Sequence, residues 1–430
     1  MEYIAKMDSM LEDVKNLLNY FAKDCKISHN VIAYLSNPEK VLKVNLPLVM
    51  DDGSLKHFTG YRTRYSTALG PAKGGIRFHQ NVDEDTINAL ALLMVLKNSL
   101  SGLPYGGGKG GVRVDVSQLS NKEKERLCRL YINSISDFIG ENIDIPASDV
   151  GISSENIGWM SDEYDSTMKK KSPATITGKP VALGGSLFRK EATGFGVFLS
   201  TKKLLEKLTN TTKSYTIAIQ GFGNVGLYSA KFLFDFGYKI VAISDVNGGI
   251  FDENGINVNL LISKTQEYSN QSLGGITNNK IMDCFPKAKS ISNEDLLNLN
   301  VDVLVLGAID DVITQSNMLN IKAKYIIEGA NAPISRVADE ELTKNGVIIV
   351  PDILANSGGV IVSYFEWIQN LQAYYWTSDE VKKKLTIKME DVFEKVWSVS
   401  KKENKSLRSS AYAIALRRIE ETIKAKHSCL

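Results

Sequence analysis

The feature that most constrains the fold is a strand, a glycine turn and a helix that follow one another from residue 214. The segment SYTIAIQ has the alternating, β-branched character of a strand, GFGNVG follows it at once, and residues 224–237 have helical spacing. A second strand, KIVAIS, ends at Asp245, about 24 residues beyond the first glycine. A GxGxxG motif alone is weak evidence, but in this setting it predicts a Rossmann-like, doubly wound dinucleotide-binding domain.

The glycine turn GFGNVG and Asp245 are predicted to bind different parts of a dinucleotide. Glycines let the backbone approach a pyrophosphate at the helix N-terminus, where N–H groups and the helix dipole favour negative charge. The candidate residues are Gly221, Gly223, Asn224, Val225 and Gly226. Asp245 would accept hydrogen bonds from the adenosine ribose, and because a carboxylate repels a 2′-phosphate it favours NAD. NADP stays open, since neighbouring residues also contribute to the choice.

A second unusual stretch, residues 70–111, places three lysines among glycines and one apolar helical run. Apolar residues recur at helical spacing from Asp83 to Leu100, and Met94 and Lys97 should share one face of this helix. Lys73 and Lys109 are predicted to lie in glycine-rich turns on either side of it. The alternatives are a snorkelling Lys97 on a half-buried helix and glycines that form flexible surface loops.

Three ammonium groups in one pocket would have a chemical consequence. Each disfavours the charge on its neighbours, and partial burial has the same effect, so the pKa of one lysine can fall toward neutrality. That lysine could act as an acid or base while the others hold carboxylates. The pocket would suit a dianionic or zwitterionic substrate whose carbon bears an amine or a carbonyl.

Composition bounds the remaining possibilities. A chain of 430 residues exceeds one ordinary core and should form two domains. A formal charge of +2 gives no reason to expect nucleic acid or an anionic membrane as a partner, and the N-terminus lacks the apolar core of a signal peptide. The four cysteines form no CxxC pair and no metal set with the four histidines. They indicate reduced thiols in a cytosol, with no metal.

The remaining elements are predicted from local pattern. Residues 8–36 should form one or two helices, and a hairpin is expected around the turn at 51–53, with Arg64 solvated on an edge strand. With the lysine-bearing helix these make an N-terminal α+β domain with a mixed sheet. Strands at 302–307, 323–329 and 346–352 should extend a parallel sheet in the second domain, and the C-terminal tail should be helical.

Several motifs together carry a family resemblance. GPAKGGIRFH, MVLKN, LPYGGGKGG, IPASDVG, EATGFGV, GFGNVG, EGANAP and PDILANSGGVIVSYFEW resemble, in order and spacing, those of glutamate dehydrogenases, within the wider Glu/Leu/Phe/Val dehydrogenases. The resemblance runs from about residue 40 to the C-terminus. It implies a substrate-binding and oligomerisation domain at 1–182 with helices 360–430 packing back on it, and a dinucleotide-binding domain at 183–359. It also implies a homohexamer whose two domains close on the substrate, and the cysteine usage places it in the cytoplasm.

The resemblance also assigns site residues. It implies that Lys109 and Asp149 are catalytic, although Asp149 before a glycine is ordinarily a turn former. The remaining matches are Lys73 and Ser363 for a distal carboxylate, Lys97 with Met94 and the backbone near Gly151 for the α-carboxylate side, and Thr193, Asn331 and Asn356 for the nicotinamide end. The chain departs from the family at Phe188, where glycine is usual, and at Gly307, where proline is common.

Lys73 bears on the choice of substrate. Relatives that act on leucine, valine or phenylalanine carry an apolar residue there, since an unpaired ammonium facing an aliphatic side chain is costly. The resemblance therefore implies reversible NAD(P)-dependent oxidative deamination of L-glutamate to 2-oxoglutarate and ammonium. The alternatives are a branched-chain amino acid dehydrogenase and a noncatalytic cofactor-binding regulatory protein.

Overall fold

The computed structural model describes residues 9–208, 215–271, 281–308 and 311–426. The chain forms two compact units. The first contains Met1–Arg189, Val360–Val381 and Tyr412–Leu430, and the second contains Lys190–Gly359 and Lys382–Ala411. The predicted boundary at 182/183 and the return of 360–430 onto the first domain stay predictions; residues 382–411 group with the second unit.

The first unit is built on a five-stranded mixed sheet with the order β1-β2-β4-β3-β5. Its strands are β1 (Lys40–Val49), β2 (Leu55–Ser66), β3 (Ala72–His79), β4 (Gly107–Arg113) and β5 (Asp144–Ser148). β1 and β2 form the predicted hairpin, β2 pairs antiparallel with β4, and β3 pairs parallel with both β4 and β5. The predicted α+β class with a mixed sheet is confirmed.

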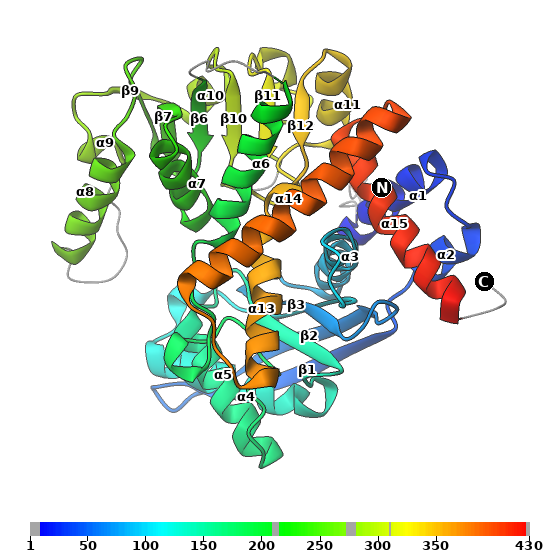
Figure 1. The fold of residues 1–430 in the computed structure, drawn as a ribbon. Helices are drawn as coiled ribbons and strands as arrows, with labels where there is room; N and C mark the ends of the chain where they lie inside the picture. The colour runs from blue at the N-terminus through cyan, green and yellow to red at the C-terminus, as the bar shows by residue number, and fades with distance from the viewer. Residues whose placement is uncertain (1–8, 209–214, 272–280, 309–310, 427–430) are drawn as a thin grey trace, which may run out of the picture. The chain divides into compact units, whose positions relative to one another are not determined.

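Helices cover both faces of this sheet. The helices of residues 9–189 are α1 (Met10–Asp24), α2 (His29–Tyr34), α3 (Glu84–Leu100), α4 (Asn121–Ile135) and α5 (Ser154–Met168), with short turns η1 (Val116–Gln118), η2 (Ser136–Phe138) and η3 (Val181–Leu183). Successive strand residues point to opposite faces. A Cβ on Gly110 would meet Tyr131 of α4, whereas one on Gly111 would meet Ile87 of α3. α3 and α4 therefore lie on opposite faces of β4 (Figure 1).

The glycine-rich turns predicted around Lys73 and Lys109 are wrong, because both lysines lie inside strands. Gly74 and Gly108 let β3 and β4 approach so closely that a Cβ on Gly74 would overlap the Gly108 carbonyl oxygen. A Cβ on Gly107 would collide with Val95 and the Ala91 carbonyl of α3. The glycines serve close packing of strand on strand and helix on strand, which a sequence rich in glycine does not distinguish from a loop.

The predicted edge strand for Arg64 is also wrong. β2 lies between β1 and β4, so only β1 and β5 are edges of this sheet. Arg62 is fully buried and forms an ion pair with Asp144 of β5, and its Nη1 donates to the carbonyl of Gly74 at 3.2 Å. The half-buried Arg64 guanidinium lies over the ring of Phe138, 4.2 Å from its centroid. Arg62 is therefore buried in an ion pair, and Arg64 is packed against an aromatic ring.

The second unit is built on a seven-stranded sheet with the order β12-β11-β10-β6-β7-β8-β9. Its strands are β6 (Thr216–Gln220), β7 (Lys239–Asp245), β8 (Gly248–Phe251), β9 (Lys289–Ile291), β10 (Val303–Leu306), β11 (Tyr325–Glu328) and β12 (Ile348–Val350). The strands from β12 to β7 run parallel, as predicted, while β8 and β9 add an antiparallel edge that the sequence reading missed.

Helices connect these strands in a doubly wound arrangement (Figure 1). They are α6 (Ala192–Leu208), α7 (Asn224–Asp235), α8 (Val258–Gln271), α9 (Ile281–Cys284), α10 (Asn293–Leu297), η4 (Met318–Asn320), α11 (Arg336–Lys344) and α12 (Asp352–Ala355). The tail is helical, as predicted, with α13 (Gly358–Gln372), α14 (Ser378–Glu403) and α15 (Leu407–Lys426). β6 lies between β7 and β10, so the strand order reverses there, and ligands bind beyond the strand ends at such a point.

Candidate active site

Lys109 and Asp149 meet in the first unit, together with an arginine that the sequence reading did not single out. Lys109 Nζ lies 3.0 Å from Asp149 Oδ1, and Arg77 Nε lies 2.8 Å from Asp149 Oδ2. The three side chains come from neighbouring elements: Arg77 from β3, Lys109 from β4, and Asp149 from the turn after β5. Gly75 makes room for the acid, because a Cβ there would lie 2.7 Å from the Asp149 Cβ.

The charges in this cluster shift one another's pKa. Burial acts to raise the pKa of Asp149, but Lys109 and Arg77 outweigh it and hold that pKa at about 2. Burial lowers the pKa of Lys109; Asp149 raises it, and Arg77 lowers it further. At neutral pH the cluster therefore contains an ionised carboxylate beside a lysine that gives up its proton more readily than usual.

Lys73 is buried at 1% exposure and belongs to a second polar group. Its Nζ donates to Thr177 Oγ1 at 2.9 Å, and the Thr177 hydroxyl lies 2.7 Å from the hydroxyl of Ser363. Burial lowers the pKa of Lys73 well below its usual value, and the positive charges of Arg189 and Arg62 lower it further. A carboxylate bound here would reverse this shift, since an opposite charge favours the ammonium form.

A buried ion pair fixes the segment that carries Thr177. The Glu366 carboxylate of α13 accepts hydrogen bonds from the backbone N–H groups of Gly178 and Lys179, and it lies 2.9 Å from Lys179 Nζ. Lys179 Nζ also donates to the carbonyls of Pro173 and Ile176. These contacts hold Ser363 and Thr177 next to one another, because they join α13 to the segment that follows α5.

The other predicted substrate residues lie on the elements that the sequence predicted. Met94 and Lys97 are half-buried and three residues apart on α3, which begins after the capping residue Asp83. Gly151 has φ +77°, and a Cβ there would overlap the Phe78 carbonyl, so this turn requires glycine. Ser153 forms a capping box with Asn156 at the start of α5.

The glycine turn of the second unit has the features that a dinucleotide requires. Gly221 has φ +94°, a Cβ on Gly226 would overlap the Gly221 carbonyl, and around Gly223 there is open space where a side chain would be. Gly223 is the N-cap of α7, and no side chain caps that helix. Its first N–H groups, at Asn224 and Val225, are thus available to a pyrophosphate.

Asp245 ends β7, as predicted, and is half-buried. Its Oδ1 accepts the N–H of Asn247 at 2.7 Å, and its Oδ2 accepts the N–H of Ile281 at 2.9 Å. The adjacent Val246 is 94% exposed. The carboxylate is held in place at the end of the second strand, where the ribose of a dinucleotide is read.

Asn331 and Asn356, predicted for the nicotinamide end, contact one another. Asn356 Nδ2 donates to Asn331 Oδ1 at 3.1 Å and to the carbonyls of Gly329 and Ala330, whereas its buried Oδ1 has no partner among the described residues. An amide N–H of a ligand would satisfy this acceptor. Thr193 lies half-buried in the first turn of α6. The second unit's residues therefore fit a nicotinamide dinucleotide.

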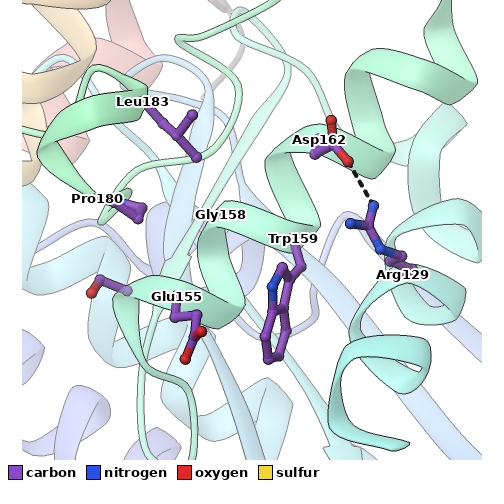
Figure 2. A pocket seen from close by; sticks show the side chains of 8 residues that line it. Arg129, Glu155, Gly158, Trp159, Asp162, Pro180 and Leu183 are labelled. Carbon is purple, nitrogen blue, oxygen red and sulfur yellow. Dashed lines mark hydrogen bonds and ion pairs between the residues drawn. The ribbon is translucent and has the colours of Figure 1, made fainter. Parts of the chain in front are cut away.

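A surface hollow of about 570 Å³ in the first unit contains none of the predicted site residues. Figure 2 shows Trp159 and Asp162 of α5 on one side and Pro180 and Leu183 on the other, with Arg129 of α4 held by Asp162 at 2.8 Å. Arg129 is also paired with Glu125 and Glu163. Because these carboxylates neutralise the charge of Arg129, the hollow offers no uncompensated cation to an anionic substrate.

Arg77, Thr177 and Arg62 are the polar residues of the site that the sequence reading missed. A signal for Arg77 was present, since GPAKGGIRFH read as a strand places Lys73 and Arg77 on the same face. In the described part of the chain, no three His, Cys, Asp or Glu side chains are arranged to hold a metal, and Cys25, Cys128 and Cys284 are buried thiols outside any disulfide. No described helix is long and apolar enough to cross a membrane.

A lysine-rich mixed sheet in one unit and a dinucleotide turn in the other define a nicotinamide-dependent dehydrogenase. Residues 38–166 match the family model of the Glu/Leu/Phe/Val dehydrogenase dimerisation domain, and residues 184–426 match that of Glutamate/Leucine/Phenylalanine/Valine dehydrogenase. The chain belongs to this family.

Characterised relatives cover nearly the whole chain. It is 43% identical over 418 residues to the NADP-specific glutamate dehydrogenase of Synechocystis sp., covering 97% of each chain. It is also 43% identical over 390 residues to the NAD-specific glutamate dehydrogenase of Staphylococcus aureus, covering 91% of each.

Solved structures agree with this assignment. The glutamate dehydrogenase from Peptoniphilus asaccharolyticus is 36% identical with a TM-score of 0.84, covering 97% of this chain and 100% of that one. The hetero-hexameric glutamate dehydrogenase from Thermus thermophilus, in its Leu bound form, is 30% identical with a TM-score of 0.89, covering 99% of each chain.

Proposed function

We propose that this chain is a glutamate dehydrogenase that reversibly converts L-glutamate to 2-oxoglutarate and ammonium with NAD or NADP. The observation that carries the proposal is the buried Lys73, hydrogen-bonded to Thr177, whose hydroxyl contacts Ser363. A buried ammonium next to two hydroxyls is costly unless an anion completes the group. A second substrate carboxylate supplies that anion, and the aliphatic side chain of leucine or valine does not.

In the proposed mechanism Lys73 and Ser363 hold the distal carboxylate, and Lys97 with the backbone near Gly151 holds the α-carboxylate, with Met94 beside them. Asp149 accepts a proton from the substrate amine. A nicotinamide held near Thr193, Asn331 and Asn356 would supply the acceptor for the hydride from Cα. Lys109 then activates a water molecule and stabilises the carbinolamine oxygen that forms on the substrate carbon.

The second unit holds the cofactor in this proposal. Gly221, Gly223 and Gly226 with the N-terminus of α7 bind the pyrophosphate, and Asp245 binds the adenosine ribose. Thr193, Asn331 and Asn356 face the nicotinamide end. The carboxylate of Asp245 favours NAD, while relatives of equal identity carry either an NAD-specific or an NADP-specific name.

A spectrophotometric assay of the purified chain tests the proposal. Reduced nicotinamide is followed by its absorbance with ammonium and 2-oxoglutarate, in parallel with NADH and NADPH. We expect oxidation that requires both substrates and is faster with NADH. Activity with 2-oxoisocaproate but none with 2-oxoglutarate would favour the branched-chain alternative. Inactivity with every oxoacid would favour a noncatalytic cofactor-binding protein.

We propose further that the chain works as a homohexamer in the cytoplasm. The support is the dimerisation-domain match over residues 38–166 and the hexameric assembly named for the Thermus thermophilus relative. Light scattering of the purified chain should give about six times the 47.5 kDa chain mass. A monomeric mass would contradict the assembly.

A further inference from the structure

The two oxygens of the Asp149 carboxylate are held by two different cations, and the proposed function uses only one of them. Lys109 Nζ holds Oδ1 at 3.0 Å, and Arg77 Nε holds Oδ2 at 2.8 Å. Lys109 is 7% exposed, whereas Arg77 and Asp149 are 24% and 21% exposed at their side chains. Arg77 thus has no part in the mechanism above, although it contacts the residue that accepts the substrate proton.

The backbone directs Arg77 to this place. Lys73, Gly75 and Arg77 alternate along β3 and so share one face of the strand. Gly75, between the two cations, lacks the Cβ that would press on Asp149. β3 therefore places Lys73 beside Thr177 and Arg77 beside Asp149. Gly75 leaves the space that Asp149 occupies.

Two charges act most strongly on the acid. Lys109 of β4 and Arg77 of β3 have the largest charge effects on the pKa of Asp149, and both lower it. Arg62 of β2 acts on Lys109, and its own charge is paired with Asp144 of β5. Arg77 also lowers the pKa of Lys109. One guanidinium consequently acts on both members of the proposed proton-transfer pair, and in the same direction.

We propose that Arg77 is a positioning residue that fixes the Asp149 carboxylate, with Oδ1 toward Lys109, and sets the pH range in which the pair works. This inference rests on the proposed function. An arginine suits this task because its planar guanidinium stays charged at every pH of interest and donates in a fixed direction. Its contact is with the Asp149 carboxylate, so in this proposal it acts through Asp149.

The test is the pH profile of kcat/KM for glutamate oxidation in the wild-type chain and in Arg77→Gln and Arg77→Met. Removing the guanidinium raises the pKa of both Asp149 and Lys109, so both limbs of the profile should move to higher pH by about one unit. Arg77→Lys should restore the position of both limbs. Arg113→Gln, at an exposed arginine near the end of β4, is the matched control and should leave the profile in place.

The outcomes are distinguishable. A profile that loses height without moving in either neutral variant would overturn the inference, because a purely structural role lowers the rate at every pH alike. Circular dichroism selects the variant that folds, and either neutral variant is sufficient. A wild-type chain that is inactive with glutamate would instead overturn the proposed function, and with it the premise of this inference.

Discussion

Each of the two units buries a cluster of charged side chains, but the ratio of cations to carboxylates is reversed between them. In the first unit one carboxylate, Asp149, lies between Lys109 and Arg77. In the second unit one cation, Arg408, meets three carboxylates: Glu328 at 2.6 Å, Asp339 at 2.9 Å and Asp352 at 3.7 Å.

The reversed ratio has opposite consequences for the acids. The two cations hold the pKa of Asp149 at about 2 against the effect of burial. In the second cluster the pKa of Glu328 is raised to about 7. Burial is the largest cause, Arg408 acts against it, and the negative charge of Asp352 adds to it. In the proposed mechanism the excess positive charge keeps Asp149 ionised so that it can accept a proton, whereas the excess negative charge around Glu328 favours its protonated form within the scaffold.

The scaffold cluster also reaches the loop that carries Asn331. Glu328 Oε2 accepts the N–H of Asp352 at 2.8 Å, and Asp352 Oδ2 accepts the N–H of Ala332 at 3.0 Å. The cluster therefore connects the end of β11 and the start of α12 to the turn at Ala332, which lies between β11 and α11. Its contribution should appear in stability, while that of the Asp149 cluster should appear in turnover.

The largest expected effect is on turnover in Lys109→Ala. Loss of the lysine removes both the activated water and the stabilisation of the carbinolamine oxygen, so kcat should fall about 10³-fold or more. Cofactor binding, measured by the fluorescence of the reduced nicotinamide, should be unchanged. Lys56→Ala, at an exposed lysine on β2, is the control. Near-normal turnover in Lys109→Ala would contradict the mechanism.

The next largest effect is expected in the stability of the Arg408→Met variant. Removing one partner of a buried ion pair leaves the others without compensation and costs about 3–5 kcal/mol, to be measured as the free energy of unfolding in urea. Arg336→Met is the matched control, since its pair with Glu340 is exposed and should contribute about 1 kcal/mol or less. Equal stability of the two variants would show that the cluster is not a scaffold.

The pH dependence of stability separates the two clusters further. The pKa of Glu328 in the folded chain, about 7, is above the usual value of 4.5, so between these values the folded state binds a proton that the unfolded state lacks. Stability relative to Glu328→Gln should therefore fall by about 3 kcal/mol as pH rises from 4.5 to 7, and level off above that. Glu294→Gln, at an exposed acid of α10, should show no such difference.

A smaller effect is expected for specificity in Lys73→Met. Loss of the ammonium removes one charge-assisted contact to the distal carboxylate, worth about 2–3 kcal/mol, so kcat/KM for 2-oxoglutarate should fall roughly 100-fold. The rate with 2-oxoisocaproate should rise relative to it, because the apolar side chain no longer faces a buried charge. An unchanged ratio of the two rates would show that Lys73 does not read the second carboxylate.

The smallest effect concerns Phe188, which takes the left-handed φ of +60°. This conformation explains why glycine would be usual there, since a Cβ in it costs about 1 kcal/mol. Phe188→Ala and Phe188→Gly lose the same ring, but only glycine relieves the backbone. Phe188→Gly should be the more stable of the two by about 1 kcal/mol in urea unfolding. If the alanine variant were as stable, the backbone would be unstrained.

The sequence predicted the second unit more completely than the first, for a physical reason. Around GFGNVG the period of apolar residues and the glycine spacing agree with one another, so strand, turn and helix were found where they lie. At Lys73 and Lys109 glycine suggested turns, whereas the chain uses it to bring β3, β4 and α3 close together. That use depends on partners distant in sequence, which local pattern does not contain.

The same limit explains the missed site residues. Thr177 contacts Ser363 across 186 positions of the chain, and Arg62 contacts Asp144 across 82. Neither residue stands in a motif of its own that indicates a ligand. The spacing of Lys73 and Arg77 predicts that both side chains lie on one face, but only if GPAKGGIRFH is first assigned as a strand.

In the proposed function, Lys73 in the first unit selects substrates that carry a second carboxylate. The most direct measurement is the ratio of kcat/KM for 2-oxoglutarate to that for 2-oxoisocaproate, in the purified wild-type chain with ammonium and saturating NADH or NADPH. The account predicts a ratio above about 100, the value of one buried charge-assisted contact. A ratio below one would contradict it and assign Lys73 another role.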